Sequence, residues 1–165
     1  MALASLKDVY LHQMQDLYSA NEQALEATTA LARAADDDTL IRALEDGVNG
    51  IARGLEKIAE LAGEHGIDPT AEHCRGMEGL AEEARAHGIE AAYDAPAVRD
   101  AMIIAQYQRM VHYGIAGYGC LVAYANRLGL DGDAAVLQDC LDHTRSGDAH
   151  MTSIATTAVN AAAAA

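Results

Sequence analysis

The sequence contains no phenylalanine, no tryptophan and only two prolines in 165 residues. Proline interrupts helices, whereas the alanine, leucine and glutamate that dominate here favour them, so the composition indicates an all-helical fold. The length suits one domain with a single hydrophobic core. We therefore expect one all-α domain over residues 1–160, followed by a flexible alanine tail at 161–165.

Cysteine is also scarce. Cys74, Cys120 and Cys140 show no CxxC or Cys/His spacing, which argues against a zinc site. Cys120 and Cys140 fall in apolar helical stretches, so the sequence predicts that both are small buried hydrophobes.

Positive charge and long apolar runs are missing as well. The chain has 11 Lys and Arg against 25 Asp and Glu, a formal net charge of −14, which disfavours binding to nucleic acid or to an anionic membrane. No window reaches about 18 apolar residues, and the N-terminus lacks a charged segment followed by a long apolar run. We expect no membrane span and no signal peptide, and a reduced, cytoplasmic protein with a solvated acidic surface.

Helical periodicity is what the sequence does contain. Apolar residues recur at spacings of three and four over about 3–34 and 39–65, in a long stretch from Asp94 to the "GLDGD" turn at 129–133, and over about 134–159. A short helix is predicted around 71–87. Asp94 is the predicted N-cap of the third long helix, with Pro96 in its first turn. Four long amphipathic helices with a longer second connection describe a four-helix bundle of the crossover type.

Glycines stand out in the third long helix, in the stretch "AMIIAQYQRMVHYGIAGYGCL" at 101–121. Gly114, Gly117 and Gly119 each cost about 1 kcal/mol relative to alanine in a helix interior. A buried helix that carries three of them calls for an explanation.

Four stretches resemble a known family: "DLYSANEQ", "CRGMEGLAEEA", "VRDAMIIAQYQRMVHYGIAGYGCL" and "GLDGDAAVLQDCLDHTRSGDAHMT". They are similar to the YciF-type (YciE/YciF, DUF892) branch of the ferritin-like superfamily, over roughly residues 6–158. The resemblance implies a ferritin-like four-helix bundle with a short extra helix in the crossover. It also implies a stress-associated homodimer with a di-metal centre between the helices.

The ligands for such a centre are largely absent. A di-metal site in a bundle needs a carboxylate from each of two helices, and a carboxylate with a second ligand one turn away from each of the other two. Where the family pattern has acids and histidines, this chain has Asn21, Gly47, Asn49, Gly50, Ala52 and Gly114, and the last helix keeps only Asp142-His143-Thr144 and Asp148. We therefore expect no metal and no other cofactor.

Glycines in place of large ligands remove volume from a close-packed interior. Either the helices close up and neighbouring Tyr or Met side chains fill the gap, or a pocket remains for a small molecule. The predicted pocket lining is Tyr18, Asn21, Gly47, Gly50, Gly54, Tyr107, Val111, Gly114, Tyr118 and Thr144.

Four residues are candidates for acid–base chemistry in that pocket. Asp148 would be its one central carboxylate, with a pKa raised by burial, while His112, His143 and Tyr113 could carry protons. Each also has an ordinary interpretation, as a satisfied or solvent-facing carboxylate, a surface histidine or a core tyrosine.

Three hypotheses for function follow. The first is a metal-independent ferritin-like protein with a small-molecule binding or catalytic pocket at the former metal centre. The second is a structural or stress-associated bundle without chemistry. The third, which the resemblance alone would suggest, is a di-iron oxidase with unusual ligands.

Overall fold

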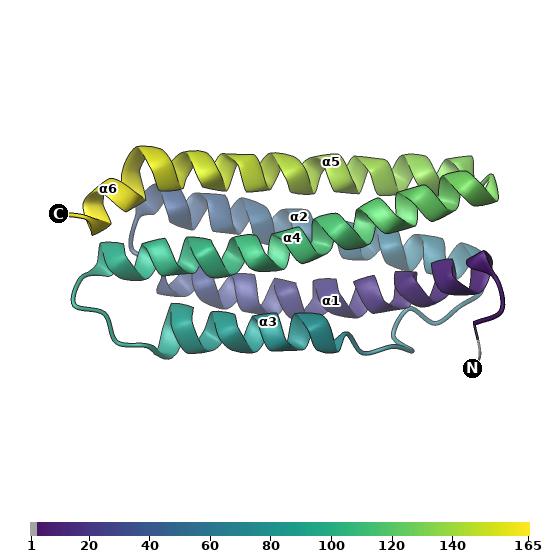
Figure 1. Cartoon of the computed structure of the whole chain (residues 1–165), viewed down its shortest axis with the longest axis horizontal. Coiled ribbons are helices and arrows are strands. Elements are labelled where there is room, and N and C mark those ends of the chain that lie inside the picture. The colour runs from purple at the N-terminus through teal and green to yellow at the C-terminus, as the bar shows by residue number, and fades with distance from the viewer. Residues whose placement is uncertain (1–2) are drawn as a thin grey trace.

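The computed structural model describes residues 3–165, and most of them are helical. Four long helices lie side by side: α1 (Leu6–Ala34), α2 (Asp38–Glu64), α4 (Pro96–Leu128) and α5 (Asp131–Ile154) (Figure 1). The short α3 (Arg75–Arg85), extended by a π-helical turn (Ala86–Glu90), lies in the crossover between α2 and α4. The predicted all-α four-helix bundle with an extra helix in its crossover is therefore confirmed.

The order of the helices around the bundle decides which residues meet inside it. Helix α1 packs against α2 and α4, and α5 packs against the same two helices, so α2 and α4 face each other across the diagonal. Every side chain that crosses from α4 to α2 must therefore pass through the centre of the bundle.

Helix starts follow the local sequence closely. Ser5 caps α1 in a reciprocal capping box with Asp8, whose backbone N–H donates to Ser5 Oγ and whose carboxylate accepts from the Ser5 N–H. Asp37 caps α2 by accepting from the backbone N–H groups of Thr39 and Leu40. The acidic run Asp36-Asp37-Asp38 therefore leads into the second helix.

Two predicted boundaries need correction. The N-cap of α4 is Ala95, not Asp94, and it makes no side-chain cap. The residue before a proline is driven to extended geometry, so Ala95 leaves the helical region and the helix begins at Pro96. At the other end, the last helix continues through a π-helical turn (Ala155–Val159), as far as predicted, and is followed by α6 (Asn160–Ala163), which overlaps the predicted flexible tail at 161–165.

The core is mainly aliphatic, and its other large side chains are methionine and tyrosine, since the sequence has no phenylalanine or tryptophan. Its largest fully buried side chains are Tyr10, Met14, Leu17, Leu31, Leu40, Leu44, Ile58, Met77, Ile103, Leu121, Leu137 and Met151. The prediction for cysteine was wrong in part: Cys74 is buried, Cys140 is half-buried, and Cys120 is exposed because it lies on the outer side of α4. Among residues 3–165, no helix is long and apolar enough to span a membrane.

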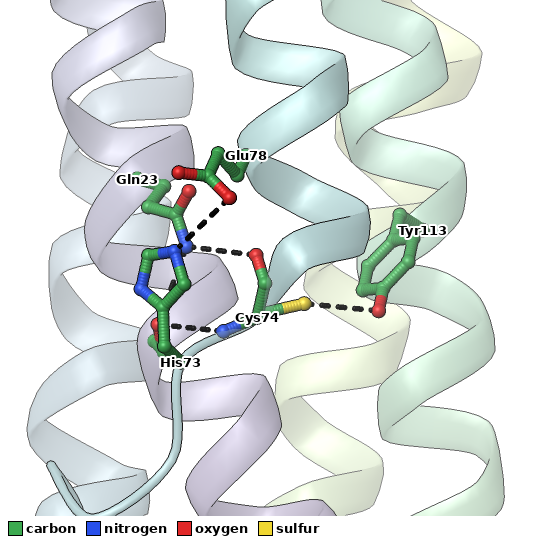
Figure 2. A network of polar contacts seen from close by, with 6 residues as sticks. Gln23, His73, Cys74, Glu78 and Tyr113 are labelled. Atoms are coloured by element: carbon green, nitrogen blue, oxygen red, sulfur yellow. Dashed lines mark hydrogen bonds and ion pairs between the residues drawn. The ribbon is translucent and has the colours of Figure 1, made fainter.

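The crossover is fastened to the bundle by a polar network around Cys74 (Figure 2). The Cys74 N–H donates to Ser19 Oγ, and Gln23 Nε2 donates to the Cys74 carbonyl. Cys74 Sγ lies 3.0 Å from Tyr113 Oη, which also donates to Asp16. The start of α3 is thus tied to α1 and α4.

A second polar cluster closes one end of the bundle. Tyr10 Oη donates to Asp133 Oδ2 at 2.7 Å, and His65 Nε2 lies 2.6 Å from the same oxygen. Lys7 Nζ lies 3.0 Å from His65 Nδ1. Because a lysine ammonium only donates, Nδ1 is the acceptor and the His65 proton sits on Nε2, facing Asp133. The cluster joins α1, the end of α2 and the first turn of α5.

Replacing Asp133 with Asn should cost roughly 1–3 kcal/mol at neutral pH, because the buried hydrogen bond from Tyr10 and the partly buried one from His65 lose their charged acceptor. Burial raises the pKa of Asp133, but the hydrogen bonds from His65 and Tyr10 outweigh it and hold the pKa below 3.8. The ionised carboxylate therefore stabilises the fold above about pH 4, and this contribution is lost as the pH falls through the lowered pKa.

Urea unfolding of wild type and Asp133→Asn between about pH 7 and pH 3 measures this. The difference between the two should be constant near neutrality and shrink below about pH 4. Asp131→Asn, an exposed change in the same first turn, should stay within about 0.5 kcal/mol of wild type. A difference that grows on acidification would contradict the assignment.

Candidate functional site

A cavity of about 520 Å³ lies between the four long helices. Buried residues of α1 and α4 form its floor, whereas several α2 and α5 residues along its edge are exposed. The cavity therefore opens to solvent between α2 and α5. Its interior is mainly apolar, with aliphatic side chains such as Ile51, Met110 and Val136 among its walls.

Two tyrosines of α4 reach across the diagonal to α2 and form part of the cavity wall. A Cβ built on Gly47 would lie 2.5 Å from Tyr107 Oη, and one built on Gly54 would overlap the Tyr118 hydroxyl. Only glycine lets these hydroxyls rest on the α2 backbone. Gly47 and Gly54 are seven residues apart, so the two contacts lie about 10 Å from each other along the helix.

Between the two tyrosines the bundle stays open. A Cβ built on Gly114 would meet no atom within 4 Å, although the residue is buried, because it faces the cavity. The other two glycines of α4 have different surroundings: a Cβ on Gly117 would press on Leu17, and one on Gly119 would be free. Tyrosine side chains thus fill the ends of the glycine-rich interior, while its middle remains hollow.

Neutral polar groups line the buried part of the cavity. Asn21 Nδ2 donates to Tyr118 Oη at 2.8 Å, which leaves the Tyr118 proton available for a further acceptor. Thr28 is 0% exposed, and within residues 3–165 its Oγ1 has no hydrogen-bond partner. Burial, with a smaller effect of the Asp148 charge, raises the pKa of Tyr107 to about 12, so its hydroxyl is neutral at physiological pH.

The mouth carries the charged groups of the site. Arg53 Nη2 lies 2.9 Å from His143 Nε2 and joins α2 to α5 across the opening. The imidazole of His143 lies over Gly50, where a Cβ would come within 2.9 Å of Nε2. Because arginine only donates, Nε2 accepts, and the proton of this neutral histidine is on Nδ1. Lys57 lies along the same edge, with its ammonium paired to Glu60.

The structure brings most of the predicted residues together. The cavity lining includes Asn21, Gly47, Gly50, Gly54, Tyr107, Val111, Gly114, Tyr118, His143 and Thr144. Tyr18, Tyr113, His112 and Asp148 are not part of it.

Asp148 and His112 are paired with each other outside the cavity. His112 Nε2 lies 3.0 Å from Asp148 Oδ2, and Gln108 Nε2 donates to Asp148 Oδ1. The side chain of His112 is 64% exposed and that of Asp148 is 21% exposed. Both carboxylate oxygens are therefore satisfied by the outer side of α4, which corrects the placement of Asp148 as a central pocket carboxylate.

The two tyrosines also lie elsewhere for identifiable reasons. Tyr113 turns toward the crossover, where its hydroxyl meets Cys74 and its ring occupies the space over Gly76. Tyr18 precedes Asn21 by almost one helical turn, beyond the end that Asn21 and Tyr118 close. Neither can line the space between the four long helices.

Several lining residues are absent from the predicted set. Thr28 lies on the apolar face of α1, so its sequence position indicates an ordinary core residue. Arg53 has the sequence surroundings of an ordinary exposed arginine. Thr28 could have been found by extending the Asn21 stripe two turns along α1. Arg53 has no signal in its own helix, because its importance comes from the α5 residues opposite.

The cavity does not suit a di-metal centre. Asn21 directs its amide N–H groups at Tyr118, Gly50 and Gly114 have no side chain, and Thr144 donates to the Cys140 carbonyl of its own helix. The carboxylates along the lining, Asp46 and Asp139, are both exposed. Within the described part of the chain, no group of three His, Cys, Asp or Glu side chains converges on a metal-sized site.

Comparison with known proteins identifies the family. A family model described as a domain of unknown function (DUF892) matches residues 5–164. The chain belongs to the DUF892 family. It is 32% identical over 160 residues to Protein YciF of Escherichia coli strain K12, covering 97% of this chain and 96% of that protein.

Two solved structures share the fold. The crystal structure of the E. coli stress protein YciF matches with a TM-score of 0.89 and 33% identity, over 96% of this chain and 99% of the other. YcfI of Rhodopseudomonas palustris, proposed to be a structural protein, matches with a TM-score of 0.84 and 28% identity, over 90% and 94% of the two chains.

The glycines at the site should respond to alanine in opposite ways. Gly114→Ala should stabilise the protein by about 1 kcal/mol, because the methyl group enters open space and the helix gains propensity. Gly54→Ala should destabilise it by roughly 1–3 kcal/mol, because the Cβ displaces the buried Tyr118 hydroxyl. Urea unfolding of both variants measures this, and equal shifts for the two would contradict the packing.

Metal loading tests the donor set directly. After incubation with Fe(II), Mn(II) or Zn(II) and desalting, elemental mass spectrometry should find no stoichiometric metal, because the cavity offers no converging carboxylates. About two ions per chain would contradict this and revive the di-iron hypothesis.

Proposed function

We propose that this DUF892 protein binds a small, mainly apolar organic molecule in the cavity between its four long helices, without a metal. The observation that carries the proposal is the open space at Gly114, in a cavity whose wall includes the buried Thr28 hydroxyl, which has no hydrogen-bond partner within residues 3–165. A volume of about 520 Å³ lies within the range of small-molecule sites, which are typically apolar with a few placed polar groups.

The polar groups of the cavity suit a neutral part of a ligand. Thr28 Oγ1 and the Tyr107 and Tyr118 hydroxyls can each donate to a carbonyl or hydroxyl oxygen. A buried hydroxyl without a partner costs roughly 1–3 kcal/mol, and a ligand oxygen would recover part of this. The resemblance to ferritin-like bundles would place a metal centre here, and the corresponding positions Asn21, Gly50 and Gly114 are small or neutral, which supports a site without metal.

The proposal is one of binding rather than catalysis. Asp148 and His112, the strongest acid–base candidates in the sequence, are paired on the outer side of α4 and α5. His143 remains at the mouth as the one predicted proton carrier in the lining. A purely structural role, as proposed for YcfI, is the alternative.

Binding of N-phenyl-1-naphthylamine, a neutral aromatic dye that fluoresces in apolar surroundings, tests the proposal. Wild type should bind it with one site per chain. Gly114→Leu should weaken binding by at least about tenfold, because the new side chain fills the cavity. Gly119→Leu is the matched control, since this glycine of the same helix lies outside the lining and faces free space.

Thermal unfolding, monitored by circular dichroism, distinguishes loss of the binding site from loss of the fold. If Gly114→Leu melts well below wild type, the smaller Gly114→Ala variant replaces it and should weaken dye binding by a lesser factor. Absence of saturable binding by wild type, or equal binding by Gly114→Leu and Gly119→Leu, would favour the structural alternative.

A further inference from the structure

We infer that the molecule bound in this cavity is an organic anion, whose apolar body lies between Tyr107 and Tyr118 and whose anionic group is held at the mouth by Arg53. The inference rests on the proposed function, because it adds a chemical class to a ligand whose binding there is itself proposed. Three features of the mouth support it: the position of Arg53, the state of its partner, and the arrangement of the nearby acids.

Arg53 holds the middle of the opening. Its guanidinium reaches from α2 to His143 on α5, directly over Gly50, so it lies above the hollow between the two tyrosines. A guanidinium has five N–H donors in a planar fork that suits carboxylate and sulfonate oxygens. A molecule whose body occupies the cavity and whose head emerges at the mouth must pass this group.

The present partner of Arg53 is a weak one. His143 Nε2 accepts from Arg53 as a neutral nitrogen, so it supplies no counter-charge to the guanidinium. A carboxylate or sulfonate would supply one and could accept two N–H groups at once. Within residues 3–165, no carboxylate lies within ion-pair distance of Arg53. An anionic head group could therefore replace His143 as the acceptor and gain energy by doing so.

The acids of the lining are placed away from this centre. Helices α2 and α5 run antiparallel, with Gly50 opposite His143 and Gly47 toward Gly147, so Asp46 lies toward one end of the mouth. Asp139 lies toward the other end, because it is about one helical turn from His143 on the side away from Gly147. The overall charge of −14 repels anions, so recognition of one must come from a local donor such as Arg53.

A neutral oxygen on the ligand body would complete the fit. Thr28 belongs to the Gly47 end of the cavity and Asn21 to the Gly54 end, because α1 and α2 run antiparallel. The unpartnered Thr28 hydroxyl is fully buried, so it can serve only a group that enters the cavity. The ligand class is thus a small monoanion with an apolar body and room for one internal hydroxyl or carbonyl.

Two dyes that differ by a single anionic group test the inference. 8-Anilinonaphthalene-1-sulfonate carries a sulfonate that N-phenyl-1-naphthylamine lacks. Wild type should bind the sulfonate more tightly than the neutral dye. Arg53→Gln should reduce that preference by about five- to tenfold, because the head group loses its charged donor. Arg42→Gln, an equal charge change on an exposed α2 residue outside the lining, should leave the preference unchanged.

The outcomes separate the two proposals. Equal or tighter binding of the neutral dye, or a sulfonate preference that survives Arg53→Gln, would overturn the anion inference while the cavity remains a binding site. If Gly114→Leu leaves binding of both dyes intact, neither dye occupies the cavity, and the proposed function fails together with the inference. The anion inference would be established if Arg53→Gln loses the preference for the sulfonate, Arg42→Gln keeps it, and Gly114→Leu binds neither dye.

Discussion

Two hydroxyls resting on two glycines set the shape of this protein's interior. Tyr107 and Tyr118 extend from α4 to the diagonal helix α2, where Gly47 and Gly54 leave room for their oxygens. A tyrosine ring is rigid and nearly incompressible in a packed core, so each acts as a spacer of fixed length. The spacers keep α2 and α4 apart at two levels, and nothing between them is large enough to fill the middle.

This constraint explains the uneven use of glycine along α4. Gly117 accommodates Leu17 where α1 and α4 approach closely, and Gly114 faces the open middle. A helix normally loses about 1 kcal/mol for such a residue, so the chain gives up stability to keep the space empty. Stability elsewhere comes from the aliphatic core and from polar fastenings such as Asp133 at the bundle end and Cys74 at the crossover.

The electrostatic layout follows the same division. Inside, the hydroxyls and one amide are neutral, and burial keeps Tyr107 protonated. At the opening, the chain brings Arg53 and His143 together from residues 90 positions apart. A neutral, partly unsatisfied interior below a mouth that carries the Arg53 guanidinium is suited to holding a molecule with two chemically different ends.

Much of the fold could be predicted from the sequence, because helix propensity, capping and apolar periodicity are local. The four long helices, the Asp37 cap and the buried stripe of α4 depend on residues within a few turns of one another. The scarcity of acids and histidines at the positions where the resemblance implies metal ligands could also be read directly from the sequence. Asp94 failed as a cap because the strict geometry around Pro96 outweighs a favourable side chain one place earlier.

What only the tertiary structure decided is how residues of different helices meet. The sequence alone allowed either collapse or a pocket, since packing depends on whether Tyr107 and Tyr118 cross to α2 or turn aside. The helical periodicity predicted that Asp148 and Tyr113 face the centre of the bundle. Each residue instead lies a fraction of a turn around its helix, so that Asp148 contacts His112 and Tyr113 contacts Cys74. The pairing of Arg53 with His143 has no local signal at all, because the juxtaposition of α2 and α5 is a property of the whole bundle.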